Sequence, residues 1–249
     1  MPAPQLVTGN IYAVPRKGLI NDGEKRQLEF AVVHARNKAE VATNAMTTAI
    51  QRLKLNNYDE TKLSDEMWKL LRDAFLIGDE ATVQDKVKRM ASVQKVLETT
   101  RKGLRERVEI VDLPQSDFRA NRLEIEAQAR KRKYNLAPAQ DNSRYVAPKP
   151  LSPTGLFGYV RGAFPAVAGR IHLAFGYLFD EKLSTWTVIH EATHKFAGTV
   201  DNAYWDDDHN RWEKTISVGK AIKNADSYAK FAMEYKDTFL WKIVDVGVA

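Results

Sequence analysis

The spacing of apolar residues predicts a long helix near the start of the chain. One apolar stripe has members three or four positions apart, at Leu28, Ala31, Val32, Ala35, Ala39, Ala42, Met46, Ile50 and Leu53. Such a stripe is one face of a helix, and it predicts a helix over residues 24–54. Asn21 or Asp22 can cap this helix, because both residue types accept hydrogen bonds from the first free backbone N–H groups.

Two shorter stripes predict further helices, each followed by a glycine. The first covers about residues 64–77, and Gly78 is interpreted as its end. The second covers about residues 79–102, with Gly103 as its end. Residues 108–113 are apolar in the manner of a short strand.

The middle of the chain changes character. Residues 117–133 have a helical pattern, but residues 135–155 are interrupted by four prolines, at positions 138, 148, 150 and 153. Proline disrupts helices and sheets, so this stretch is interpreted as a linker or a surface loop. We therefore expect a boundary here, between residues 1–150 and residues 151–249, although the two parts can share a core.

The C-terminal part combines strands and helices. Four elements are expected in it: short strands at 157–160 and 170–175, and helices at about 180–198 and 218–239. Asp180 or Ser184 can cap the first of these helices, and Gly198 ends it. The chain as a whole is therefore expected to be an α+β protein that is mostly helical.

Composition limits the chemistry that is available. The chain has 249 residues and no cysteine, which excludes disulfides and thiolate metal sites, so any metal must be bound by His, Asp or Glu. The net charge is +6, and part of the excess lies in residues 119–133. No recognised nucleic-acid motif accompanies these basic residues, so we interpret them as a solvated helix face and expect no nucleic-acid partner.

The chain shows no membrane-spanning pattern. No window has the 18 or more apolar residues of a transmembrane helix, and the first residues lack the charged start and apolar run of a secretory signal. We expect a protein that is cytoplasmic or exported by a route that needs no cleaved signal. The compartment and the oligomeric state are left open.

The residues that carry chemistry lie in the helix expected over 180–198. His190-Glu191-Ala192-Thr193-His194 fits the H-E-x-x-H pattern. Residues four apart lie on one face of a helix, so the two imidazoles can bind one Zn²⁺. Zinc makes hydroxide available from bound water near neutral pH, and Glu191 is placed to take the proton as general base. The alternative is a pair of structural histidines on a helix.

A catalytic zinc also needs a third protein ligand from outside this helix. Gly198 lets the chain turn back, which makes Asp201 well placed. Four acidic residues and one histidine in the following loop compete with it: Asp206, Asp207, Asp208, His209 and Glu213. Spacing alone leaves the choice among them open.

A family resemblance makes that choice. The stretch HEATHKFAGTVDNAY, residues 190–204, resembles the aspzincins, the family of deuterolysin and peptidyl-Lys metalloendopeptidase. Their signature is H-E-x-x-H followed by G-T-x-D-x-x-Y, and both parts are present. The resemblance implies that the zinc ligands are His190, His194 and Asp201, and that Glu191 is the general base. It also implies that Tyr204 stabilises the oxyanion of the tetrahedral intermediate.

The resemblance extends to a possible substrate pocket. Asn224-Ala225-Asp226-Ser227-Tyr228 is similar to the N-A-D-x-Y segment that borders the S1′ pocket in this family. In lysine-specific members the Asp and a Glu three residues later bind the substrate's lysine. Asp226 matches the Asp, but Ala229 replaces the Glu. The alternative for Asp226 is a buried carboxylate bonded to the backbone. Trp205, next to Tyr204, is predicted to line the cleft.

Together these observations predict a zinc metalloendopeptidase that acts on a protein or peptide, with a preference for Lys or Arg at P1′. The resemblance implies a zincin-like catalytic half with a small sheet and an HExxH helix, preceded by a helical N-terminal region. Two alternatives are a secreted or injected effector that uses the same site on a foreign protein, and a non-catalytic zinc-binding protein.

Overall fold

The computed structural model describes residues 3–15, 18–112, 158–160, 170–173, 175, 178–206 and 211–236. The helix expected over 117–133, with its basic residues, and the proline-rich stretch at 135–155 lie outside these residues. None of the described helices is both long enough and apolar enough to cross a bilayer.

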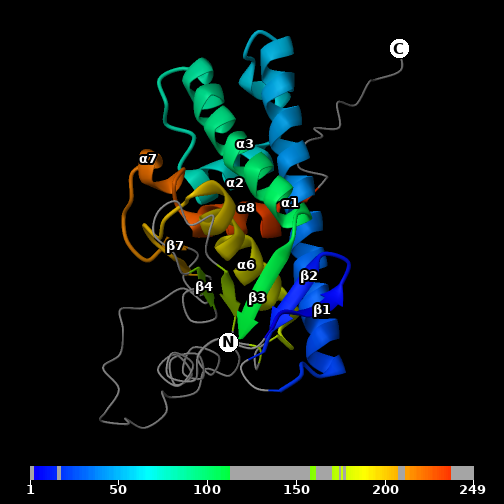
Figure 1. Cartoon of the computed structure of the whole chain (residues 1–249). Helices are drawn as coiled ribbons and strands as arrows, with labels where there is room; N and C mark the ends of the chain where they lie inside the picture. The colour runs from blue at the N-terminus through cyan, green and yellow to red at the C-terminus, as the bar shows by residue number, and fades with distance from the viewer. Residues whose placement is uncertain are drawn as a thin grey trace, which may run out of the picture.

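Helices form most of the described chain, as the apolar stripes predicted (Figure 1). The larger helices are α1 (Asp22–Leu55), α2 (Asp65–Phe75), α3 (Val83–Arg105), α6 (Glu181–Ala192) and α8 (Ala225–Glu234). The short ones are η1 (Glu60–Lys62), the π-helical turn η4 (Thr193–Ala197) and α7 (Val218–Ala221). The prediction for α1 is confirmed, and Asn21 closes its start with a capping box to Glu24.

Several helix boundaries differ from the predictions. Helix α2 ends at Phe75, where Leu76 rather than Gly78 adopts the left-handed conformation, and α3 begins at Val83 rather than at about residue 79. The stripe expected over 218–239 is divided, because the chain leaves the helix between α7 and α8 and Asn224 adopts an extended conformation. The end expected at Gly103 is wrong, because α3 continues to Arg105. Gly103 has another role: a Cβ there would lie 2.1 Å from Cγ of Phe196 in η4, so its missing side chain lets the two helices touch.

The five-stranded sheet joins the two parts of the chain. Its order is β1 (Gln5–Thr8), β2 (Ile11–Val14), β3 (Val108–Asp112), β5 (Ile171–Leu173) and β4 (Gly158–Val160). The pairs β2–β3 and β3–β5 are parallel, whereas both edge pairs are antiparallel. Strands from both sides of residue 150 are therefore hydrogen-bonded neighbours. The hairpin of β1 and β2 was not predicted from the sequence.

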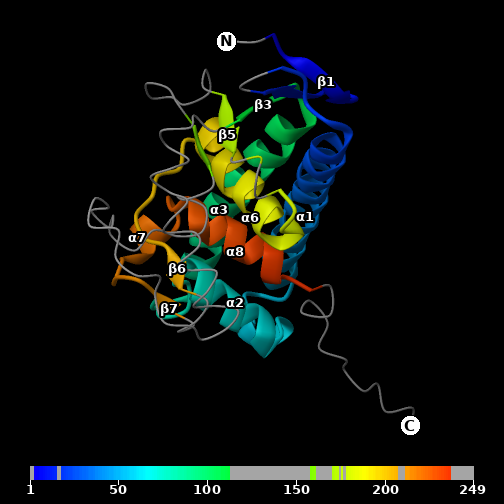
Figure 2. The ribbon, with the colours of Figure 1, turned by 90° about the horizontal axis from the view of Figure 1, so that it is seen from below.

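Helix α6 lies at the centre of the packing (Figure 2). It contacts α1, α3, α8 and the strands β4 and β5, and its residues from Ser184 to Ala192 are all buried. A helix that is buried all round is surrounded by the core. Much of the face that α1 buries consists of alanines, at positions 31, 35, 39, 42, 45 and 49. Small side chains allow close approach between helices, so α1 packs closely against α6, and α3 contacts it as well.

Candidate metal centre

His190 and His194 lie on one face where α6 passes into η4. Their Nε2 atoms are 3.0 Å apart, and the rings meet edge to face. Two nitrogen lone pairs at this distance repel each other unless a proton or a metal ion lies between them. The pair is therefore arranged for a shared cation.

Asp201 completes a cluster of three potential ligands. Its Oδ1 lies 3.0 Å from His190 Nε2 and 3.2 Å from His194 Nε2. Tetrahedral zinc with bonds of roughly 2.0–2.1 Å needs ligand atoms about 3.3 Å apart, so the spacing of this triangle fits zinc closely. Among the described residues these three form a group that could hold a metal ion, and neither Asp206 nor Glu213 belongs to it. The other competitors, residues 207–209, lie outside the described chain.

The loop that carries Asp201 is fixed by its contacts with the start of α8. Gly198 ends the helical turn with φ of 68°, a left-handed conformation that glycine adopts readily. Val200 then pairs with the segment around Asn224, since its N–H donates to Lys223 O at 2.9 Å and its carbonyl accepts from Ala225 N at 3.1 Å. These bonds hold Asp201 against the two histidines.

Asn224 is a positioning residue that the sequence interpretation did not single out. Its Oδ1 accepts hydrogen bonds from the backbone N–H groups of Asn202 at 2.8 Å and Ala203 at 3.1 Å. Asn224 is the N-cap residue of α8, yet its side chain makes no cap bond. The sequence analysis placed Asn224 inside a helix expected over 218–239 and gave its side chain no role.

Hydrogen bonds at the far side of each ring decide which nitrogen faces the site. His194 Nδ1 lies 2.8 Å from the carbonyl oxygen of Thr199, which can only accept, so Nδ1 carries the proton. His190 Nδ1 lies 3.1 Å from Oδ1 of Asp226. The Nε2 atom of each ring thereby faces the site, where it can bind a metal once it has lost any proton it carries. Thr199 is held in turn by a 2.7 Å bond between its hydroxyl and that of Thr193.

The electrostatics of the cluster favour a positive charge. Burial opposes protonation of His190, but the charge of Asp201 and the hydrogen bonds that His190 donates to Asp201 and Asp226 raise its pKa well above the usual value. Burial would raise the pKa of Asp201, but the charge of His190 and hydrogen bonds from both histidines lower it below the usual range. The field that stabilises a cationic His190 would also stabilise a metal cation at the same place.

Glu191 is a buried carboxylate with an unsatisfied oxygen. It is 1% exposed, and its Oε2 has no hydrogen-bond partner among the described residues. Burial raises its pKa to about 7, although the charges of His190 and His194 act in the opposite direction. Buried polar atoms are rarely without a partner, so this oxygen is available for a proton or a water molecule at the cluster.

Tyr204 lies beside the ring of His190. The two ring centroids are 6.3 Å apart and the planes are inclined by 25°. Burial and then the negative charge of Asp201 raise the pKa of Tyr204, so its hydroxyl keeps the proton at all physiological pH values. Tyr204 is therefore a hydrogen-bond donor at the edge of the cluster.

The two residues predicted to bind substrate are both buried. Asp226 is 0% exposed, as the alternative of a buried carboxylate expected, and its partners are two side chains as well as one backbone N–H group. Trp205 is 5% exposed, and it packs edge to face with Trp212 and beneath the ammonium of Lys230, 3.5 Å from the ring centroid. Their predicted contact with a substrate stays a prediction.

Comparison with known proteins agrees with the resemblance. Residues 177–233 match the model of the aspzincin family, described as lysine-specific metallo-endopeptidase. All seven predicted site residues lie inside the matched segment. No curated protein and no solved structure matches the chain. At the level of the family, the match supports a zinc metallopeptidase.

Proposed function

We propose that the segment matching the aspzincin family, residues 177–233, makes this chain a zinc-dependent endopeptidase that cleaves a protein or peptide. One observation carries the proposal. His190 Nε2, His194 Nε2 and Asp201 Oδ1 form a triangle with sides of 3.0–3.2 Å, next in the chain to the buried Glu191. A zincin-like arrangement, with α6 as the HExxH helix and the small sheet near it, is part of the proposal.

The chain offers the number of ligands that a catalytic zinc requires. Such sites use three protein ligands and keep one position open for water or substrate. Zinc, when bound, would polarise a peptide carbonyl and lower the pKa of water at the site. His190 and His194 would bind it through Nε2 and Asp201 through Oδ1.

Glu191 acts as the general base. Its carboxylate removes a proton from the attacking water and later delivers that proton to the nitrogen of the leaving amine. In the metal-free protein burial raises the pKa of Glu191 to about 7, so its carboxylate accepts a proton more readily than an exposed glutamate does. The unpartnered Oε2 supports this role, because no hydrogen bond within the described residues has to be broken first.

Tyr204 acts as a donor to the substrate carbonyl oxygen. That oxygen gains negative charge as the carbonyl carbon becomes tetrahedral, and a fixed donor stabilises the charge. The raised pKa of Tyr204 supports the role, because the hydroxyl is a donor over the whole working range of pH. Its stacking beside His190 supports its place next to the ligands.

A preference for Lys or Arg at P1′ is the finer part of the proposal, and the resemblance implies it through Asp226. Asp226 has no exposed surface, and Ala229 replaces the glutamate of lysine-specific members. We therefore expect the preference to be weaker than strict lysine specificity. Mapping the cleavage sites in a proteome-derived peptide mixture measures it directly.

Two alternatives keep the same cluster. In the first, the chain is a delivered effector, and residues 1–150 dock it to the secretion machinery. Binding of residues 1–150 to a component of that machinery would favour this alternative. The packing of α1 and α3 against α6 and η4 favours a supporting role for these helices, so docking ranks second. In the second, the protein binds zinc without catalysis, and stoichiometric zinc without turnover would favour it.

The proposal is tested by Glu191→Gln. The variant should bind zinc one-to-one and lose about 10²–10⁴-fold in peptide cleavage, which is the usual contribution of a general base. Glu181→Gln is the matched control, because Glu181 is exposed in the first turn of the same helix. Equal cleavage by Glu191→Gln and wild type would refute the mechanism.

A further inference from the structure

Asp226 connects the first histidine of the cluster with the loop of the third ligand. Its Oδ1 accepts from His190 Nδ1 at 3.1 Å and from Trp186 Nε1 at 2.9 Å. Its Oδ2 accepts from the backbone N–H of Trp205 at 2.6 Å. One carboxylate thus holds α6 with one oxygen and the segment after Asp201 with the other.

We infer that Asp226 is a positioning residue for the metal centre. The inference rests on the proposed zinc site, and it gives Asp226 a different role from the one that the family resemblance implied. Two donors share Oδ1 and a third uses Oδ2, so the carboxylate is occupied by the protein itself. A buried carboxylate in this state is poorly suited to bind the ammonium of a substrate.

The bond to His190 has two consequences for a metal. It fixes the plane of the imidazole, and it holds the proton on Nδ1, so that Nε2 faces the site with its lone pair. A negative partner also makes the imidazole a stronger ligand. The bond to Trp205 adds a third consequence, since it fixes the chain four residues after Asp201 at a set distance from His190.

The same segment of chain strengthens the connection through independent bonds. Asn224 accepts from Asn202 and Ala203, and Ala225 donates to Val200 O. Asp226 is the member of this group that reaches across to α6. We therefore expect its removal to loosen the ligand geometry more than the removal of any charge further along α8.

Asp226→Asn tests the inference, because the side chain keeps its size but loses its charge and one acceptor. Zinc affinity is measured by competition with a chromophoric chelator, after a thermal melt has shown that the metal-free variant is folded. We expect the affinity to fall about 10–100-fold, the usual effect of losing such a partner. Glu234→Gln is the matched control, since Glu234 lies on the same helix and bonds to Lys230.

The outcomes separate the possible roles. Weaker zinc binding with an unchanged P1′ profile supports positioning. Unchanged zinc affinity in Asp226→Asn overturns the inference. If the zinc affinity is unchanged but the P1′ profile changes, Asp226 belongs to the substrate pocket instead. If the wild type itself binds no zinc, the proposed function fails instead.

A second measurement needs no variant. In ¹⁵N-labelled, zinc-loaded wild type, the histidine ring nitrogens can be assigned by long-range proton–nitrogen correlation. We expect His190 to carry its proton on Nδ1, with a downfield shift from the carboxylate hydrogen bond. A proton on Nε2, or a metal on Nδ1, would overturn the inference even if Asp226→Asn does not fold.

Discussion

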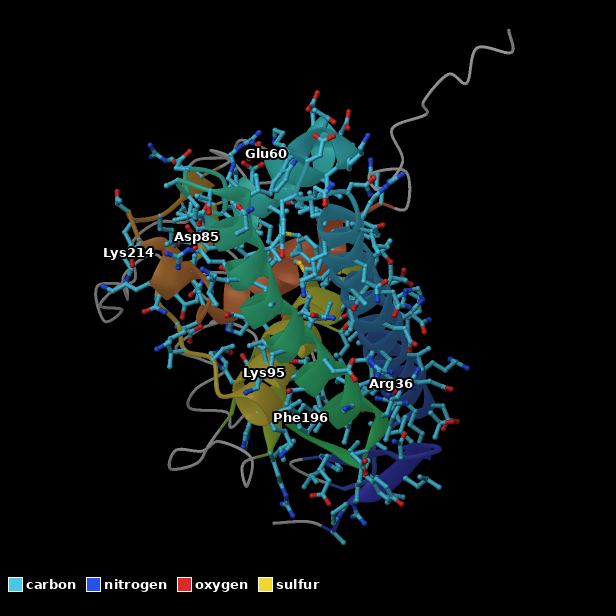
Figure 3. The ribbon with its side chains drawn as sticks, turned by 90° about the horizontal axis from the view of Figure 1, so that it is seen from above. Arg36, Glu60, Asp85, Lys95, Phe196 and Lys214 are labelled. Carbon is cyan, nitrogen blue, oxygen red and sulfur yellow. The ribbon has the colours of Figure 1, made fainter. Side chains whose placement is uncertain are left out.

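A methyl group on Gly103 would occupy space that the ring of Phe196 fills. The Cβ of Gly103→Ala would lie 2.1, 2.3 and 2.5 Å from Cγ, Cδ1 and Cδ2 of that ring, so the ring or the helix must move by more than 1 Å. Figure 3 shows Phe196 beside helix α3. Helix propensity alone favours alanine over glycine by about 1 kcal/mol. Overpacking typically costs 1–3 kcal/mol, and here it must exceed the gain from propensity.

We therefore expect Gly103→Ala to lower the free energy of unfolding by up to about 2 kcal/mol, the overpacking cost less the propensity gain. Because Phe196 follows His194 by two residues in η4, the displacement should also weaken zinc binding. Equilibrium denaturation with urea measures the first effect, and chelator competition measures the second.

A double-mutant cycle isolates the contact. In Phe196→Ala the ring is gone, so adding Gly103→Ala to that variant should be neutral or stabilising, as propensity predicts. The coupling between the two changes should then be about 1–3 kcal/mol. Stabilisation by Gly103→Ala in the wild-type background would refute the close approach of α3 and η4.

Two further predictions concern the cluster itself. Tyr204→Phe removes one donor to the oxyanion, so it should lower kcat by about 10–1000-fold and leave the zinc content unchanged. Steady-state kinetics on a peptide substrate measure this effect, and an unchanged kcat would contradict the role of Tyr204. The pKa of His190 is raised, and zinc must displace the proton that the imidazole carries below that pKa. Zinc affinity should therefore fall about tenfold per pH unit below the pKa of His190. An affinity that does not change between pH 6 and 7 would contradict the assignment of His190 as a zinc ligand.

The helices were largely predictable from the sequence because helical periodicity is local. The stripe over 24–54 is the buried face of α1, and the cap at Asn21 is present. The end of α3 was mispredicted because Gly103 was interpreted by its backbone preference alone, while its reason is a contact with Phe196, far away in the sequence. Contacts of this kind cannot be inferred from spacing.

The sheet was harder to predict for the same reason. Val108–Asp112 and Ile171–Leu173 were expected as strands, but their parallel pairing joins segments separated by the whole middle of the chain. The β1–β2 hairpin has strands of four residues each, too short for a clear alternation of apolar and polar residues. Its place beside β3 is visible only once the chain is folded (Figure 1).

The metal ligands of the candidate site were predicted from the sequence, but the roles of the residues that hold them in place were not. The spacing of HEATH placed His190 and His194 on one helix face, and the structure brings Asp201 to both of them. The supporting roles of Thr199 and Asn224 were not predicted. The backbone carbonyl of Thr199 accepts from His194, and the side-chain oxygen of Asn224 accepts from the backbone N–H groups of two residues in the loop after Asp201. Asp226 was singled out by the family resemblance, with a buried carboxylate as the alternative, but its partners depend on how α8 packs against α6.

The measurement that tests the central claim most directly combines metal analysis with peptide cleavage on the wild-type chain. Mass spectrometry of the native protein should find one zinc ion per chain, and His190→Ala should abolish it. Chelation should stop cleavage, and added zinc should restore it. A folded chain that binds no zinc, or that cleaves peptides equally well after its zinc is removed, would contradict the account.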